Sequence, residues 1–336
     1  MAQVSQQAAV KDAPRLGIMD RIDIIKNKRS FPLVFPLAML ALLVVIFHIL
    51  TGGEFLTLNV LRGVFNQSLI IGTMAIAVSF IYTTGNIDFS VGNVMGLAAV
   101  FGAMAYQATG SMTVMIIVTF LSGVALMMCN CALGVLFHIK SAMVAIVAMS
   151  VYSAFTVFLV GAEPLKVDYQ ICKVLEGNFR YIAFILYFGG CILMYHKTAI
   201  GRKLRFIGGN VVCAKQTGIN ENESIVTAFI FAGIGVGLAG VFQILRTGNI
   251  AQGVGTGMGM DVMLATVLGG MSIFGGAKSN AYAGFIGAVT VTVLNRGLLM
   301  LGVSSTLIQG ARAIIFLLLV FMNSERQSTL PSRQQF

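Results

Sequence analysis

Residues 84–92 read TGNIDFSVG, and residues 247–255 read TGNIAQGVG. The two nonapeptides share Thr, Gly, Asn, Ile, Val and Gly at matching positions, at an offset of 163 residues (247 minus 84). The same offset also pairs Gly72 with Gly235, Gly96 with Gly259, Gly134 with Gly297 and Ser141 with Ser304. Self-similarity at a fixed offset is typical of a duplicated architecture. We therefore expect two structurally related halves.

The halves consist mainly of apolar runs. Of the 336 residues, 57% are hydrophobic and 10% are charged, which is too apolar a composition for a soluble domain. Because about 20 apolar residues span a bilayer as a helix, we predict an all-α polytopic membrane protein with about ten transmembrane helices. The predicted spans lie near residues 31–50, 60–83, 91–108, 112–137, 141–161, 179–196, 224–245, 258–274, 280–302 and 305–322. Abundant Gly and Ala within them favour a tight bundle.

The offset maps predicted helices 2–5 onto helices 7–10. Since five helices separate equivalent elements, the two pseudo-repeats should be inverted with respect to the membrane, which is typical of transporters. In such folds, Gly-rich discontinuous segments at corresponding positions mark the transport pathway. We expect these segments near 84–92 and 247–259. The pathway or gating candidates are Asn86, Asp88, Ser90, Asn249 and Gln252 within these segments, and Asp261 just beyond the second.

Asp88 has two open interpretations. It stands next to a predicted helix that begins near Val91, and Asp and Ser are both favoured N-cap residues, so Asp88 and Ser90 could simply cap that helix. Alternatively, Asp88 lines or gates the pathway, since a charge at the end of an apolar run is costly without a purpose or a partner.

The basic residues predict the orientation. The chain carries 22 Lys and Arg against 12 Asp and Glu, yet the basic residues lie between apolar runs, which indicates topology and not nucleic-acid binding. If the N-terminus is cytoplasmic, 15 of the 22 fall on the cytoplasmic side. We predict a basic cytoplasmic segment at 1–30, a transmembrane domain at 31–322 and a cytoplasmic tail at 323–336. Loop 197–223 would be cytoplasmic, with one short helix, and loop 162–178 external.

The sequence gives little support for an enzyme. The histidines and cysteines show neither metal-ligand spacing nor a Ser/His/Asp set, so we expect no metal and no catalytic residues. Residues 275–279, GGAKS, lack the Gly directly before Lys and the spaced Gly of a phosphate-binding loop. We therefore expect no cofactor on this chain.

Several motifs in order carry a family resemblance. Residues 85–92, GNIDFSVG, resemble the GGIDLSVG element of ribose/galactose-type sugar ABC transporter permeases, within the wider branched-chain amino acid and sugar permease superfamily. Further elements similar to that family are Gly201-Arg202, Ile207-Gly208-Gly209-Asn210, Gly218-Ile219, Asp261, Leu268-Gly269-Gly270-Met271-Ser272, Gly275-Gly276, Asn295-Arg296-Gly297-Leu298 and Leu301-Gly302-Val303. The departures are Asn86 for Gly, Phe89 for Leu, and Arg296 where the family more often has Asn.

The resemblance implies a function and partners. It implies the membrane-spanning permease subunit of a bacterial inner-membrane ABC importer, with 31–322 as the permease domain. The transported solute would be a sugar or sugar-like compound delivered by an extracytoplasmic solute-binding protein. ATP would be bound and hydrolysed by a separate cytoplasmic ATPase, and a second permease copy or a relative would complete a dimer. Loop 197–223 would couple to the ATPase, with Gly201, Arg202, Gly209, Asn210 and Gly218 as the coupling candidates.

Two alternatives stay open at the level of sequence. Related permeases carry branched-chain amino acids or nucleosides. An ion-coupled secondary transporter would share the inverted halves, and Arg296 and Arg312 within apolar runs are compatible with it. However, acidic residues inside the predicted membrane region are few besides Asp88 and Asp261.

Overall fold

The computed structural model describes residues 31–272, 275–276 and 279–323. This part of the chain is almost entirely helical. Ten helices correspond in order to the ten predicted spans: α3 Phe31–Leu50, α4 Leu58–Thr83, α5 Val91–Thr109, α6 Met112–Leu136, α7 Ser141–Val160, α8 Tyr169–Lys197, α11 Glu221–Thr247, α12 Met258–Leu268, α13 Ala283–Met300 and α14 Ser305–Asn323. The remaining elements are short: η1 Glu54–Leu56, β1 Leu165–Lys166, α9 Ala199–Gly209, α10 Val211–Gln216 and β2 Asn249–Ile250.

Length and composition qualify seven of the described helices as membrane spans, namely α4, α5, α6, α7, the Phe179–Lys197 part of α8, α11 and α13. Three shorter apolar helices complete the ten: Pro36–Leu50, Met258–Leu268 and Thr306–Leu317. The chain is thus an all-α polytopic membrane protein, and this prediction is confirmed. The most apolar stretch of α4 is 83% buried within the protein, whereas those of α6 and α8 are only 22% buried. Helix α4 therefore lies at the centre, while α6 and α8 offer apolar faces to lipid.

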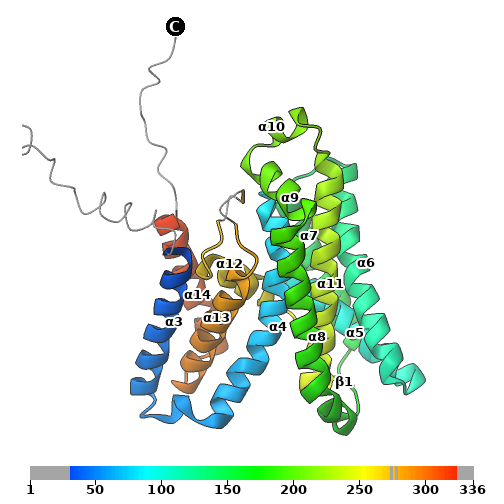
Figure 1. Cartoon of the computed structure of the whole chain (residues 1–336). Coiled ribbons are helices and arrows are strands. Elements are labelled where there is room, and N and C mark those ends of the chain that lie inside the picture. The colour runs from blue at the N-terminus through cyan, green and yellow to red at the C-terminus, as the bar shows by residue number, and fades with distance from the viewer. Residues whose placement is uncertain (1–30, 273–274, 277–278, 324–336) are drawn as a thin grey trace, which may run out of the picture.

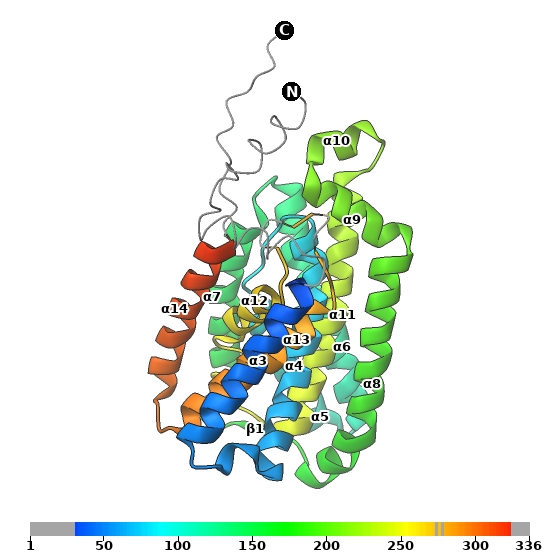
Figure 2. The same ribbon diagram turned by 60° about the vertical axis from the view of Figure 1, so that its left-hand side comes forward.

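The two repeats run in opposite directions. Helix α4 runs toward the end of the bundle that carries α9 and α10, and α11 runs away from that end (Figures 1 and 2). Shifting α4 by 163 residues gives 221–246, which nearly coincides with α11, and shifting α7 gives 304–323, which nearly coincides with α14. The contacts between helices are also related by this offset, which makes α4, α5 and α6 equivalent to α11, α12 and α13. Helix α6 packs against α11 as α13 packs against α4, and α5 packs against α6 as α12 packs against α13. The inverted pseudo-repeats are therefore a property of the fold.

The predicted discontinuous segments meet in the middle of the protein. A Cβ atom added to Gly92 would lie 2.6 Å from both the Gly255 carbonyl oxygen and the Gly259 nitrogen. Gly96 likewise faces the Val254 carbonyl. Since Gly92 and Gly255 are equivalent under the 163-residue offset, the two halves contact each other backbone to backbone near their approximate symmetry axis. Close approach of this kind needs glycine.

The bounds of two helices differ from those expected by more than three residues. The helix predicted over 258–274 ends at Leu268, because Gly269 packs against the Ala283 carbonyl and Gly270 takes a left-handed φ of +90°. An 11-residue helix rises only about 16 Å, too little to span a bilayer, so α12 is a half-helix. Helix α8 begins at Tyr169, ten residues before the predicted 179, because the Asp168 side chain caps it by accepting from the Gln170 nitrogen at 2.9 Å.

Loop 197–223 contains two short helices where one was predicted. The break falls at Asn210, whose backbone is extended (φ −161°, ψ 110°) and whose side-chain oxygen accepts from the Cys213 nitrogen at 3.1 Å. Asn210 thus ends α9 and caps α10. The predicted N-terminal segment 1–30 and residues 324–336 of the predicted tail lie outside the described residues.

Candidate functional site

The first candidate cluster surrounds Asp88, which lies between α4 and α5 and is only 1% exposed. One carboxylate oxygen, Oδ1, accepts from the Ser90 nitrogen at 2.8 Å and from the Ser90 hydroxyl at 2.6 Å. The chain of bonds continues outward, as Asn130 of α6 donates to Ser90 Oγ at 2.8 Å and Tyr152 of α7 donates to Asn130 Oδ1 at 2.8 Å. The other oxygen, Oδ2, is buried without a hydrogen-bond partner in the described part of the chain.

This geometry bears on the capping interpretation. Ser90 stands at the N-cap position of α5, but its side chain makes no capping bond to the helix and donates to Asp88 instead. Asp88 satisfies the Ser90 nitrogen in an Asx-type turn, two residues along the chain. Asp88 therefore shapes the entry into α5 without bonding the first turn of the helix itself.

The second candidate cluster surrounds Asp261 of α12, which is 5% exposed. Arg312 of α14 forms an ion pair with it, Nη1 to Oδ1 at 2.8 Å. Asn295 of α13 joins the two by accepting from Arg312 Nε at 2.8 Å and donating to Asp261 Oδ2 at 3.4 Å. The charge of Arg312, which sequence left as an option for ion coupling, is thus neutralised internally. Arg296, the other arginine in question, is exposed.

The remaining pathway candidates are divided between two regions. Asn86 is part of the segment with Asp88, and its side chain donates to Thr84 Oγ1 at 2.9 Å. Asn249 and Gln252 are exposed and lie in a second region, beside loop 161–168. There Asn249 pairs with Lys166 in the short β1–β2 ladder, and Gln252 donates to the Gly161 carbonyl. The structure therefore does not bring all six candidates into one site.

The predicted coupling residues lie at the end of the bundle that carries α9 and α10, opposite the β1–β2 ladder (Figure 1). Helix α9 buries Gly201, Leu204 and Ile207 and exposes Arg202. Gly201 packs directly on the Tyr195 carbonyl at the end of α8, so its lack of a side chain is required.

The other two glycines among the predicted coupling residues have space around them. No atom would lie within 4 Å of a Cβ on Gly209 or Gly218, and Gly218 needs glycine only for its φ of +81°. The glycine that packs closely is the neighbour of Gly209. A side chain on Gly208 would collide with the Thr83 carbonyl and lie 2.6 Å from the Gly276 nitrogen. Gly208 is part of the family-like element Ile207-Gly208-Gly209-Asn210 but was not among the predicted coupling residues, although helical spacing from Gly201 and Leu204 places it on the packed side of α9.

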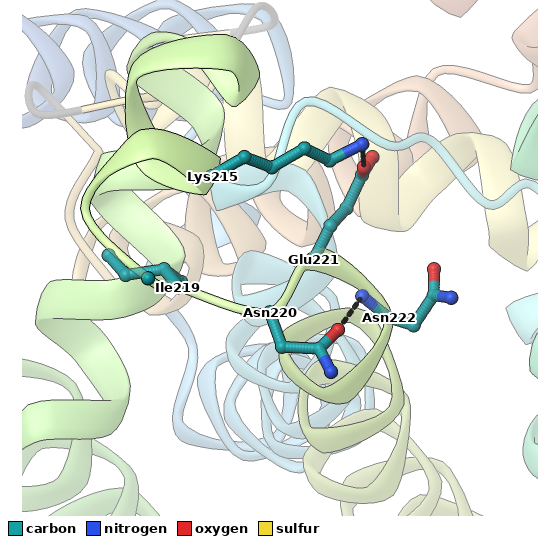
Figure 3. A pocket seen from close by; sticks show the side chains of 6 residues that line it. Lys215, Ile219, Asn220, Glu221 and Asn222 are labelled. Carbon is teal, nitrogen blue, oxygen red and sulfur yellow. Dashed lines mark hydrogen bonds and ion pairs between the residues drawn. The ribbon is translucent and has the colours of Figure 1, made fainter.

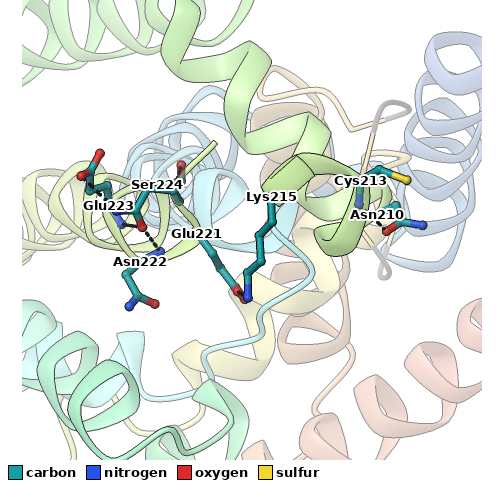
Figure 4. Close-up of polar contacts among 8 residues, drawn as sticks. Asn210, Cys213, Lys215, Glu221, Asn222, Glu223 and Ser224 are labelled. Atoms are coloured by element: carbon teal, nitrogen blue, oxygen red, sulfur yellow. Dashed lines mark hydrogen bonds and ion pairs between the residues drawn. The ribbon is translucent and has the colours of Figure 1, made fainter. Parts of the chain in front are cut away.

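A hollow of about 290 Å³ lies where α10 leads into α11 (Figure 3). It is lined by Lys215, Gly218, Ile219, Asn220, Glu221 and Asn222. Lys215 and Glu221 form an ion pair at 2.7 Å across it, and Asn220 caps α11 by accepting from the Asn222 and Glu223 nitrogens. All lining residues are within eight positions of one another, so the hollow belongs to the loop surface and not to a route through the bundle. Figure 4 shows the polar contacts that order this surface.

The structure also reveals polar contacts at the opposite end that the sequence did not suggest. Arg180 of α8 is 1% exposed and donates to Asn66 Oδ1 at 2.7 Å, while Arg246 of α11 donates to Gln67. Both acceptors belong to α4. Among the described residues, no group of three metal-ligating side chains is found.

Comparison with known proteins bears on what these elements form. A family model described as branched-chain amino acid transport system / permease component matches residues 60–323. The chain belongs to this permease family. The match begins within α4 and ends with α14, so it includes both repeats, both polar clusters and the α9–α10 surface of the permease.

Individual relatives of the permease are transport proteins. The chain is 26% identical to the ribose import permease protein RbsC of Escherichia coli K12, over 86% of this chain and 94% of the relative. It is 28% identical to the autoinducer 2 import system permease protein LsrC of Photorhabdus luminescens, over 83% and 85%. It is 26% identical to the fructose import permease protein FrcC of Rhizobium meliloti, over 81% and 80%. No solved structure matches the chain.

Proposed function

We propose that this permease is the membrane-spanning subunit of an ATP-driven importer for a sugar or sugar-like solute. The observation that carries the proposal is its match, over more than four fifths of its length, to permeases named for ribose, autoinducer 2 and fructose import. Transport through the bundle fits the inverted repeats and the half-helix α12. The chain binds no cofactor of its own, and a separate cytoplasmic subunit hydrolyses ATP.

The two ends of the bundle receive different partners in this proposal. The α9–α10 end faces the cytoplasm and docks the ATPase, because it exposes basic and apolar side chains on one short amphipathic helix, such as Arg202 and Phe206. The β1–β2 end faces outward and receives the solute-binding protein. Both termini are cytoplasmic, a second copy of the permease or a related chain completes a dimer, and the membrane is the bacterial inner membrane.

Uptake into proteoliposomes tests the solute class. Purified permease, reconstituted with its ATPase and binding protein, should accumulate labelled ribose, fructose or a related sugar when ATP is supplied. Accumulation of labelled leucine or a nucleoside, without any sugar, would contradict the sugar assignment. Uptake that follows an imposed ion gradient without ATP would favour the secondary-transporter alternative.

Charge reversal tests the docking surface. Arg202→Glu should reduce co-purification of the ATPase by about tenfold, the effect of roughly 1.4 kcal/mol in a contact between charged groups. Lys166→Glu is a matched control, because Lys166 is also an exposed basic residue and lies at the β1–β2 end. Equal loss of the ATPase in both variants would remove the assignment of α9 as the docking element.

Thiol labelling tests orientation. Cys129 and Cys213 are exposed, while Cys131, Cys172 and Cys191 are buried. With Cys129 replaced by alanine, native Cys213 should react with a membrane-impermeant maleimide only after the membrane is opened. With Cys213 also replaced and Glu163→Cys introduced, the same reagent should label intact cells. Labelling of both positions from one side would refute the proposed topology.

A further inference from the structure

The side chain and backbone of Tyr195 join three elements beneath helix α9. Tyr195 lies near the end of α8 and is fully buried. Its hydroxyl is 2.8 Å from Thr83 Oγ1, at the end of α4, and 2.9 Å from the Ser279 carbonyl oxygen. Its ring meets the Phe80 ring edge-on at 5.5 Å. One side chain therefore contacts α4 and the segment between α12 and α13.

Helix α9 holds Tyr195 through both backbone and side chain. Gly201 packs on the Tyr195 carbonyl without an intervening side chain. Arg205 donates from Nη2 to that carbonyl at 3.4 Å, donates from Nε to the Gly201 carbonyl at 3.1 Å, and places its guanidinium 5.3 Å from the centre of the Tyr195 ring. These contacts leave little freedom for α9 to move without moving Tyr195.

We call the contacts of Tyr195 with Thr83 and Ser279 the Tyr195 junction. Its Thr83 side is close to Asp88 along the chain. Thr83 is the last residue of α4, and the next residues form the segment that contains Asp88. The Gly276 nitrogen donates to the Thr83 carbonyl at 3.0 Å, and the Tyr82 hydroxyl donates to the Asp88 carbonyl at 3.3 Å. A displacement of Thr83 is thus transmitted to Asp88 over a few bonded and hydrogen-bonded atoms.

The hydroxyl groups at the junction have fewer protons than contacts. Thr83 Oγ1 also lies 2.6 Å from the Ser79 carbonyl. Tyr195 and Thr83 together therefore make three contacts: one with each other, one with Ser79 and one with Ser279. Each hydroxyl carries a single proton, so only two of the three contacts are hydrogen bonds at any moment. The Tyr195–Thr83 contact can therefore lose its proton without breaking the other contacts of these two residues.

We propose that Tyr195 is a positioning residue that transmits movement of α9 to the Asp88 segment. The proposal rests on the proposed function, in which α9 contacts the ATPase, and it assigns the step that follows docking. The hydroxyl is the essential group, because it alone links α8 to both Thr83 and Ser279, whereas the ring and the carbonyl hold α9.

The experiment compares two tyrosines of the same helix. Tyr195→Phe removes the hydroxyl and keeps the ring beneath Arg205. Tyr187→Phe is the matched control, because the Tyr187 hydroxyl donates to the Phe231 carbonyl of α11 at 3.2 Å and makes no hydrogen bond to the described residues of α9 or α4. Reconstituted importers are assayed for bound ATPase and for ATP hydrolysed per sugar molecule accumulated. Tyr195→Phe should bind the ATPase normally and raise that ratio about fivefold, the effect expected from losing one hydrogen bond in one of two states.

Thr83 provides a second route to the same test. Thr83→Val should reproduce the higher ratio, Thr83→Ser should restore the wild-type ratio, and the double variant with Tyr195→Phe should add nothing further. These variants also decide the matter if Tyr195→Phe does not fold. An unchanged ratio in Tyr195→Phe and Thr83→Val, an equal rise in Tyr187→Phe, or loss of ATPase binding in Tyr195→Phe would each overturn the inference. Failure of the wild-type permease to bind the ATPase would instead refute the proposed function.

Discussion

In each half of the bundle a cluster of polar side chains links three helices, and the two clusters use different interactions. In the N-terminal half, Asp88, Ser90, Asn130 and Tyr152 link the start of α5 to α6 and α7 through hydrogen bonds alone. In the C-terminal half, Asp261, Asn295 and Arg312 link α12 to α13 and α14 through an ion pair and an amide. The helices joined are equivalents under the 163-residue offset, but the residues that join them are not.

The difference lies in how each carboxylate is compensated. Asp261 has a guanidinium at 2.8 Å, so its cluster has no net charge and is best suited to holding three helices together. Asp88 has only hydrogen-bond donors on Oδ1, and Oδ2 is without a partner among the described residues. A buried acid that is incompletely paired is costly in a membrane. We therefore interpret the C-terminal cluster as structural and the N-terminal cluster as the one available for function.

The largest expected effect comes from Arg312→Met. It leaves Asp261 buried without its cation, and breaking a buried ion pair from one side costs about 3–5 kcal/mol. The free energy of unfolding, measured by detergent titration in mixed micelles, should fall by that amount. Arg296→Met is the matched control, because Arg296 is exposed and should change stability by less than about 0.5 kcal/mol.

The double variant Asp261→Asn, Arg312→Met sharpens the same comparison. Since it removes both charges, it should recover much of the stability lost in Arg312→Met. If Arg312→Met and Arg296→Met proved equally stable, the ion pair would not be what joins α12 to α14.

A smaller effect is expected from Tyr152→Phe in the N-terminal cluster. The variant removes the donor to Asn130 Oδ1 and keeps the ring, so it should cost about 1 kcal/mol, the net value of one hydrogen bond. The same titration measures it. Tyr106→Phe is the control, since the Tyr106 hydroxyl makes no hydrogen bond to the described residues. A loss as large as that of Arg312→Met would mean that the hydrogen-bonded Asp88 cluster contributes as much stability as the ion-paired Asp261 cluster.

The sequence predicted what depends on local patterns. Apolar runs and the 163-residue offset were sufficient for ten helices in order and for the inverted repeats. The end of α12 was misplaced by six residues, because apolar residues such as Met271 continue beyond the Gly269–Gly270 break. The glycine pair was visible in the sequence, but within a membrane segment glycine also serves packing, so composition alone did not mark the end.

The partners of the polar residues were not predictable from the sequence. Arg312 stood as an isolated charge in an apolar run, and its partner Asp261 is 51 positions earlier (312 minus 261). Tyr195 and Thr83 were not singled out at all, since neither lies in a motif and the contact between them spans 112 positions. Such pairings depend on how helices distant in sequence pack. In contrast, the close packing of Gly208 on Thr83 follows from its helical spacing from Gly201 and Leu204, and it could have been predicted.

The smallest change in stability, and the most informative change in activity, is expected from Asp88→Asn. Asparagine keeps an acceptor at the position of Oδ1, so the bonds from the Ser90 nitrogen and hydroxyl remain. It also removes a charge from a site that is 1% exposed. We therefore expect the free energy of unfolding to stay within about 1 kcal/mol of wild type.

Uptake by the Asp88→Asn variant should nevertheless fall when it is normalised to folded, reconstituted permease. The reason is Oδ2, which has no partner among the described residues in this conformation and is available to accept a hydrogen bond when the segment moves; the Asn amide is a donor and cannot replace it. Wild-type turnover per folded molecule in Asp88→Asn would leave Asp88 with only its role in shaping the turn into α5. A loss of folded protein in proportion to the loss of uptake would assign it to assembly. Only reduced turnover at unchanged stability supports the difference between the two clusters that the structure indicates.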